Sequence, residues 1–496
     1  EEGRSAVDSW NAGRARGVAR ELMQRYPESP FVLSVAAQAD FISGRYAACR
    51  EKLDRIEELG GEPPEKLQHI TGELEDLHES FQTVESDQFT ISYARPVDGI
   101  LAEYAPEVLE RSLSVLSDYL NWRPEENKIR VEIYPTLSSF STATTLSTEE
   151  IRTSGAVAIC KFNRIMIASP RLYMQGYRWA DTLSHELTHY ILIRKTGHDI
   201  PVWLHEGIAK STETLWREGH SSTRLTPMQS TLLAQAREED RFIPFDDMAI
   251  SLVKLDSREE VALAYAEVVS FIHYLKDSYG VDSLSDVIGY IEEGKSVKAA
   301  LRETGGAETS DMYEQWEKWV SNVSLDPIPG LRVLPRKIAE GEDNTARDER
   351  MMGGVEEEAQ RYVRLGDMLR DESRPNAAAI EYRKAVGQAE TISPELRVEL
   401  ARVLLKSDQV GAAEATLEEV AEYYPDFLPL YLVRARLRRR EGDEEGAIED
   451  LRTVVSINPF DPRPHRMLVK LYQRIGETDK VEREQRVLDK IDGWLE

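Results

Sequence analysis

The sequence has few cysteines and no long apolar run. Only two cysteines, Cys49 and Cys160, occur among 496 residues. Their scarcity excludes a disulfide-rich scaffold and a zinc site built from several cysteines. The longest apolar runs, such as 156–160, fall far short of the roughly 18 to 20 residues that span a bilayer. We therefore expect no transmembrane segment in this chain.

Basic residues are also scarce relative to acidic ones. The chain has 62 Lys and Arg residues against 89 Asp and Glu residues, which gives a formal net charge of −27. This balance argues against a nucleic-acid partner, because neutralising phosphates requires a basic surface. The hydrophobic fraction of 41% and the charged fraction of 30% are typical of a folded globular protein. The length predicts two to four folded units.

The C-terminal third contains internal repeats. Small or apolar residues recur at intervals of 34 or 35 positions, at Ala378, Ala413, Ala447 and Val481. Pro425 and Pro459 are also 34 residues apart. Small residues where two helices cross, with a proline that closes the unit, are typical of tetratricopeptide (TPR) repeats. The pattern predicts four helix pairs over 356–496.

The N-terminal segment shows a weaker form of the same pattern. Ala15 and Cys49 are 34 residues apart, and a stripe of apolar residues at helical spacing follows, at Leu67, Ile70, Leu74, Leu77 and Phe81. Such a stripe is suited to capping a small helical solenoid. We expect a TPR-like helical unit over 1–82.

Between these helical ends the sequence pattern changes to that of a mixed domain. Alternating residues at 89–94 and 129–135 predict half-buried strands, with a helix from about 98 to 120 between them. The segment 156–169 reads as two further strands or a hairpin with Asn163 at their junction. Helices are expected from there to Val323. We therefore predict an α+β domain.

A linker is expected between this domain and the C-terminal repeats. Three prolines between 327 and 335 and the charged run EGEDNTARDER mark it at 326–355. The expected domains are thus 1–82, 85–325 and 356–496, with an α+β domain flanked by all-α solenoid modules.

The stretch SHELTH contains an H-E-x-x-H motif. On a helix, His185 and His189 lie on one face and can both reach one cation. Glu186 is turned about 100° from His185, beside the metal, where a general base would act. Chance occurrence of the motif, with two ordinary histidines on a helix surface, is the alternative. A third ligand would separate the two interpretations.

Catalytic zinc has three protein ligands and an open position for water. Lys195 occupies the place ten residues after the first histidine where a metzincin has its third ligand, so that class is excluded. A second helix begins near Pro201 after a short loop and should run antiparallel to the first. His205 and Glu206 both fall within reach of the site, and periodicity does not choose between them.

HELTH followed by PVWLHEGIAKSTE resembles the gluzincin metallopeptidases, which have a W-L-x-E-G-x-A signature after the H-E-x-x-H helix. The resemblance covers about 85–325. It implies a zinc ion held by His185, His189 and Glu206, with Glu186 as the general base that acts on zinc-bound water. His205 then occupies the variable position of the signature and is the rival third ligand.

The same resemblance implies two further parts of the site. Tyr265 would stabilise the oxyanion, and a strand within 155–171 would bind substrate at the sheet edge, although ordinary core roles are the alternatives. The chain departs from the family at Lys210, where many gluzincins have an acidic residue that orients a zinc histidine. Glu213 is a candidate for that role.

These features together predict a zinc-dependent peptidase that hydrolyses a protein or peptide substrate and uses TPR modules to dock a protein partner or the substrate. The alternative is a TPR scaffold or chaperone-like binding protein whose metal site is structural or nearly silent. The family resemblance and the absence of an initial methionine favour the bacterial periplasm, the cell envelope or secretion after removal of a leader.

Overall fold

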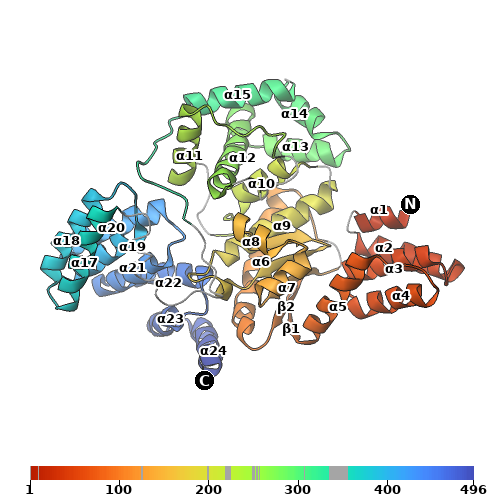
Figure 1. Cartoon of the computed structure of the whole chain (residues 1–496), viewed down its shortest axis with the longest axis horizontal. Helices are drawn as coiled ribbons and strands as arrows, with labels where there is room; N and C mark the ends of the chain where they lie inside the picture. The colour runs from red at the N-terminus through yellow and green to blue at the C-terminus, as the bar shows by residue number, and fades with distance from the viewer. Residues whose placement is uncertain are drawn as a thin grey trace. The chain divides into compact units, whose positions relative to one another are not determined.

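Helices form most of the chain in the computed structural model, and the strands form one small sheet (Figure 1). The described residues are 2–8, 11–124, 127–197, 200–217, 225–248, 252, 255, 257–306, 308–334 and 356–495. The first of two structural units comprises 1–169, 180–224 and 243–323. The second unit comprises 170–179, 225–242 and 324–496.

The first unit begins with helices that pack in sequence. They are α1 (Glu2–Asp8), α2 (Ala12–Arg25), α3 (Pro30–Ile42), α4 (Tyr46–Glu58) and α5 (Glu65–Glu79). Ala15 and Cys49, the pair at repeat spacing, are both fully buried, as expected where helices approach closely. The predicted helical stripe is wrong at its last member: α5 ends at Glu79, and Phe81 starts a strand.

The five strands form a mixed sheet. In spatial order they are β1 (Phe81–Glu85), β2 (Phe89–Ala94), β3 (Ile129–Tyr134), β5 (Arg164–Ala168) and β4 (Ala158–Lys161). The three central strands are parallel, and β1 and β4 are antiparallel edge strands. Ile91, Val131 and Ile165 align across the centre and are fully buried. The predicted strands are confirmed.

The connections of the sheet differ from the prediction in one place. The helix expected over 98–120 is divided into a 3-10 segment, η1 (Val97–Glu103), and α6 (Ala105–Tyr119). Pro106, in the first turn of α6, has no N–H to donate, so a continuous helix would lose a hydrogen bond there.

The chain reaches β4 and β5 through two short helices and a tight turn. The helices α7 (Leu137–Thr144) and α8 (Thr148–Ser154) both begin with capping boxes. The turn between β4 and β5 has Phe162 and Asn163 at φ of 56° and 59°, as a two-residue hairpin turn requires. This confirms Asn163 as the junction and leaves β4 at the sheet edge.

A buried ionic cluster joins the N-terminal helices to the sheet. The Glu132 carboxylate on β3 pairs with Arg164 Nε on β5 at 2.9 Å, and both side chains are almost fully buried. Arg130 pairs with the same carboxylate. From α4, the Tyr46 hydroxyl accepts a hydrogen bond from Arg164. These contacts compensate the cost of burying the charges.

Six further helices of the described residues belong to the first unit and carry the predicted site. They are α9 (Trp179–Thr196), whose first residue belongs to the second unit, α10 (Val202–Thr212), α12 (Arg258–Tyr279), α13 (Ser283–Glu292), α14 (Val297–Gly305) and α15 (Thr309–Asn322). Trp203 of α10 packs edge-on against Phe271 of α12 and Phe245. Tyr313 of α15 stacks on Phe245 at 4.6 Å. This aromatic cluster fixes the rotation of α10 relative to α12.

The second unit contains α11 (Pro227–Glu238) and the predicted repeats. Their helices are α17 (Glu357–Asp371), α18 (Pro375–Gln388), α19 (Pro394–Lys406), α20 (Val410–Tyr423), α21 (Leu428–Glu441), α22 (Glu444–Ile457), α23 (Pro462–Ile475) and α24 (Thr478–Leu495). Figure 1 shows these helices in teal to blue, the colours of the C-terminal part of the chain. Ala378, Ala413 and Ala447 are fully buried where paired helices meet, which confirms the repeat pattern.

The described part of the predicted linker packs on the repeats. Leu331 is buried, and Gly330 accepts a hydrogen bond of 2.8 Å from the Ile392 backbone. The rest of the predicted linker, 335–355, lies outside the described residues. None of the described helices combines the length and hydrophobicity needed to cross a bilayer. Cys49 and Cys160 are free thiols.

Candidate metal centre

The motif helix α9 is buried on most sides. Leu183, Leu187 and Ile191 are fully buried, and they anchor the helix in the core of the first unit. Gly197 follows the last helical residue with φ of 72°, and its N–H bonds to the Ile193 carbonyl. Gly197 therefore forms the C-cap that ends the helix. His185 lies on one face of this anchored helix.

The structure brings the three predicted ligand atoms together. The Nε2 atoms of His185 and His189 lie 3.1 Å apart. The Glu206 carboxylate of α10 lies 3.2 Å from His185 Nε2 and 3.6 Å from His189 Nε2. Among the described residues, these three side chains form the one cluster of possible metal ligands whose donor atoms all lie within 4.8 Å of one another.

These separations fit a zinc ion. Zinc bonds to nitrogen and oxygen ligands at about 2.0 to 2.2 Å in a tetrahedron, which places neighbouring ligand atoms about 3.3 Å apart. The three observed separations of 3.1, 3.2 and 3.6 Å bracket that value. Two imidazole nitrogens and a carboxylate oxygen are also the donor set of catalytic zinc sites in thermolysin-like enzymes.

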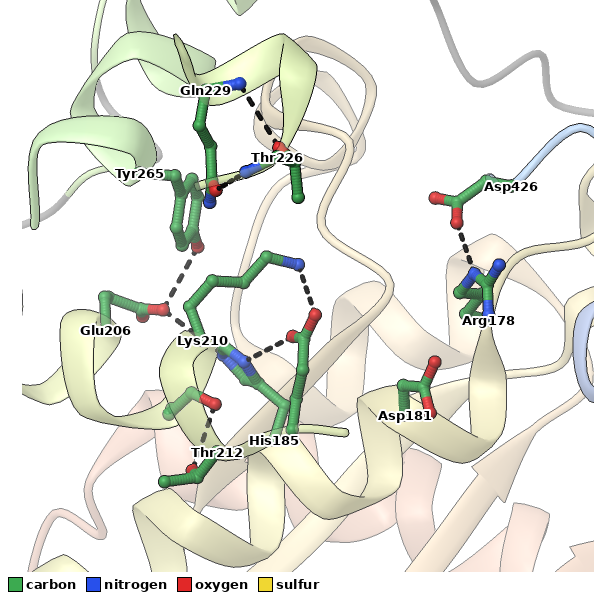
Figure 2. Close-up of polar contacts among 12 residues, drawn as sticks. Arg178, Asp181, His185, Glu206, Lys210, Thr212, Thr226, Gln229, Tyr265 and Asp426 are labelled. Atoms are coloured by element: carbon green, nitrogen blue, oxygen red, sulfur yellow. Dashed lines mark hydrogen bonds and ion pairs between the residues drawn. The ribbon is translucent and has the colours of Figure 1, made fainter. Parts of the chain in front are cut away.

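A carboxylate behind His185 sets the orientation of its ring. His185 Nδ1 lies 3.3 Å from Glu213 Oε2, and Lys210 Nζ lies 2.6 Å from Glu213 Oε1 (Figure 2). Because an ionised carboxylate can only accept, Nδ1 donates the hydrogen bond. In the neutral tautomer, Nε2 then carries the lone pair and faces Glu206. Glu213 thus lies where an outer partner of a metal-binding histidine is expected.

His205 approaches the cluster from a different side. Its Nδ1 lies 3.0 Å from His189 Nδ1, whereas Glu206 contacts His189 at Nε2. The two ring nitrogens of an imidazole point in different directions, so His205 is not among the converging donor atoms. It contacts the outer side of the His189 ring, and this arrangement favours Glu206 of the two candidates that spacing left open.

Glu186 lies beside the cluster with one oxygen unpaired. Its side chain is 5% exposed, and Oε2 has no hydrogen-bond partner among the described residues. Burial raises the pKa of Glu186, although the nearby His189 and His185 and a hydrogen bond from the Cys160 backbone oppose that shift. A buried carboxylate with a raised pKa and a free oxygen is suited to accept and return a proton.

The cluster as a whole favours a bound cation. Burial alone would lower the pKa of His185, but hydrogen bonds to Glu206 and Glu213 and the charge of Glu186 raise it to about 10. Burial alone would raise the pKa of Glu206, but His189 and His185 hold it well below its usual range. Three carboxylates around two imidazoles therefore create a negative potential at the converging atoms.

Tyr265 reaches the same carboxylate from α12. Its hydroxyl donates a hydrogen bond of 3.1 Å to Glu206 Oε2 (Figure 2). Burial and the Glu206 charge raise the pKa of Tyr265 well above its usual value. The phenol therefore stays protonated and serves as a hydrogen-bond donor next to the converging atoms.

Close packing holds the three helices of the site in place. A Cβ at Gly207 would lie 3.0 Å from the Val268 carbonyl oxygen of α12, so glycine permits the approach of α10 to α12. Between α9 and α10, the Thr188 and Thr212 hydroxyls lie 3.0 Å apart. Asp181 forms a two-pronged pair with Arg217 at 2.7 and 2.8 Å. These contacts limit the movement of the site residues.

The sequence interpretation missed two contributions to this site. The backbone of Cys160 on the edge strand β4 bonds to Glu186, and His205 contacts the outer nitrogen of His189. Backbone donors leave no trace in the residue pattern. The sequence shows that His205 and Glu206 are neighbours, but it does not show on which side of α10 each side chain lies.

Family comparisons identify two regions of the chain. Residues 123–322 match the Peptidase MA superfamily, and residues 369–437 match the tetratricopeptide repeat. No curated protein matches the chain. Among solved structures, MamA is similar at 21% identity, over 30% of this chain and 86% of that one, with a TM-score of 0.27.

A metallopeptidase is also among the similar solved structures. It is a mutant of the M1 zinc metallopeptidase from Deinococcus radiodurans bound to a Tyr-Ser-Ala substrate, 18% identical over 50% of this chain, with a TM-score of 0.29. The match spans 52%, about half, of the length of that enzyme. The chain thus contains a Peptidase MA superfamily domain, matched over 123–322, together with tetratricopeptide repeats, matched over 369–437.

Proposed function

We propose that this protein is a zinc-dependent peptidase of the gluzincin type, with His185, His189 and Glu206 as the zinc ligands. The observation that carries the proposal is the convergence of two Nε2 atoms and one carboxylate at 3.1 to 3.6 Å. The match of 123–322 to the Peptidase MA superfamily supports the same reaction class. Protein or peptide chains are the proposed substrates.

A zinc ion in this site would supply a Lewis acid that polarises the scissile carbonyl and acidifies water. Glu186 accepts the proton of the attacking water and passes it to the leaving amine, which its raised pKa and unpaired oxygen favour. Tyr265 donates a hydrogen bond to the oxygen that becomes negative in the tetrahedral intermediate. Glu213 holds the His185 ring through Nδ1.

The edge strand β4 is the proposed substrate-binding strand. The Cys160 backbone N–H points to Glu186, so the unpaired edge of β4 faces the proposed general base. An extended peptide that adds to this edge through main-chain hydrogen bonds would pass beside Glu186. Main-chain hydrogen bonds of this kind are the same for every peptide sequence. The choice of substrate would therefore depend on contacts other than this strand pairing.

The repeats are the proposed docking module for a partner or for the substrate. Solenoids of this kind offer extended surfaces for protein segments, and the tetratricopeptide match covers 369–437. We propose domain bounds of 85–325 for the peptidase, 1–82 for the N-terminal helices and 356–496 for the repeats.

Metal analysis and a peptide-library digest, performed on the wild type and on Glu186→Gln, test the proposal. The wild type should hold one zinc per chain and cleave peptides. Glu186→Gln should keep its zinc, because Glu186 is not a ligand, and lose about 10²- to 10⁴-fold in kcat. Undiminished cleavage by Glu186→Gln would refute the mechanism. A zinc-loaded wild type that binds peptides without cutting them would favour the scaffold or chaperone-like alternative.

A further inference from the structure

Basic residues recur at the repeat spacing on the first helices of three successive repeats. Arg402, Arg436 and Lys470 are 34 positions apart, and so are Lys406, Arg440 and Arg474. Each helix of the set, α19, α21 and α23, thus carries two cations four residues apart, on one helical face. We name these six residues the basic ladder.

The ladder borders a hollow in the second unit. Its volume is about 390 Å³, and its lining includes four cations, Arg370, Arg402, Lys406 and Arg436. Glu399 is the carboxylate in that lining, and buried valines contribute apolar surface. The helices α19 and α21 contact each other directly, so the hollow lies on the surface that the first helices of the repeats form. It is large enough for several side chains of a bound peptide.

Half of the ladder has no acidic partner within the described residues. Lys406, Arg436 and Lys470 are exposed and form no ion pair there. Arg440 forms an exposed pair with Asp408, and the exposed Arg474 pairs with the half-buried Glu444, each at 2.8 Å. Exposed pairs of this kind contribute little stability, so a ligand carboxylate can replace them at small cost.

The ladder is an exception in an acidic molecule. The whole chain carries a net charge of −27, and the second helix α20 contains four glutamates and no basic residue. Solubility therefore does not require these cations. Aligned like charges repel one another across neighbouring helices unless an anion lies between them. The charge pattern is complementary to an anionic ligand of extended shape.

We infer that the basic ladder binds an acidic, extended segment of a partner protein. Packed helices lie about 8 to 10 Å apart, and an extended chain in the polyproline II conformation advances about 3.1 Å per residue with three residues per turn, so every third side chain lies on one face. Acidic side chains three positions apart would therefore meet the cation pairs of successive repeats. This inference gives a chemical class to the partner in the docking part of the proposed function, and it does not involve the zinc site.

Fluorescence anisotropy with the full chain tests the inference. The probes are a labelled twelve-residue peptide with glutamate at every third position and a matched peptide with glutamine at those positions. The acidic peptide should bind more tightly, and its affinity should fall with added salt. Arg436→Glu should weaken binding by about tenfold, and Lys406→Glu similarly, because each replaces an attraction with a repulsion. Arg452→Glu, on the second helix α22, is the matched control and should bind as the wild type does.

Several results would overturn the inference. They are equal binding of the glutamine peptide, equal losses in Arg452→Glu, and preferential binding of an oligonucleotide or of anionic vesicles. Circular dichroism of each variant establishes that the repeats remain folded. Performing the titration in the Glu186→Gln background with a chelator separates docking from catalysis. A failure of the ladder then leaves the peptidase proposal standing, and the reverse also holds.

Discussion

Gly207→Ala should disturb the proposed metal centre without changing any of its polar side chains. The added Cβ would lie 3.0 Å from the Val268 carbonyl oxygen and 3.2 Å from Ile272 Cγ1 on α12. Both contacts are too close, so α10 must move away from α12. Overpacking of this kind costs about 1 to 3 kcal/mol, and the higher helix propensity of alanine offsets up to about 1 kcal/mol of that. A net loss of about 1 to 2 kcal/mol is expected.

The displacement should also reach Glu206, the proposed metal ligand. Glu206 precedes Gly207 and bonds to Tyr265 across the same helix contact, at 3.1 Å. Moving α10 by a few tenths of an ångström changes the position of that carboxylate. We therefore expect weaker zinc binding together with a lower melting temperature, by about 2 to 4 °C for each kcal/mol.

Thermal unfolding with and without zinc, together with a chelator competition, measures both effects. Gly289→Ala is the matched control, because it lies in α13 and a Cβ there meets nothing within 4 Å. That variant should be as stable as the wild type or more so, with unchanged zinc affinity. If Gly207→Ala behaves like Gly289→Ala in both measurements, the reasoning about the α10 and α12 contact is refuted.

Three further substitutions test other parts of the structure. Glu213→Gln should raise the zinc dissociation constant by about 10- to 100-fold in a chelator competition; an unchanged constant would exclude an orienting role. Glu132→Gln leaves the fully buried Arg164 without its anionic partner. The free energy of unfolding, measured with denaturant, should fall by about 3 to 5 kcal/mol. A fall below about 1 kcal/mol would refute the idea that these buried charges compensate one another. Burial raises the pKa of Glu267 to about 8, so the folded state binds an extra proton between about pH 4.5 and 8, and stability conferred at low pH is lost as the pH rises through that window. Glu267→Gln keeps an acceptor for the Ile243 N–H and should remove that part of the pH dependence of the melting temperature, whereas an unchanged profile would contradict the raised pKa.

Periodicity predicted most of the architecture. The 34-residue spacing placed the repeat helices, since each recurrence marks a position where two helices cross, as at Ala413. Alternation placed the strands of the sheet except β1 (Phe81–Glu85), whose first residue continues the apolar spacing of α5. Local pattern alone could not show that the helix ends at Glu79. The pairing of β1 with β2 decides it.

The proposed site was less predictable than the fold. The H-E-x-x-H spacing identified the face of α9, but it did not choose between His205 and Glu206, which neighbour each other on α10. The rotation of that helix depends on the contacts of Trp203 with its aromatic neighbours and on the close approach at Gly207. These are tertiary contacts between residues far apart in the sequence. The outer contact of Glu213 follows from the same rotation.

The zinc content of three proteins tests the central claim most directly. Elemental analysis after dialysis should find one zinc per chain in the wild type and in His205→Asn, because His205 contacts the outer Nδ1 of His189 and not its converging Nε2. Glu206→Gln should hold far less than one zinc, since the converging carboxylate is lost. A wild type without stoichiometric zinc, or zinc retained in Glu206→Gln and lost in His205→Asn, would contradict the account.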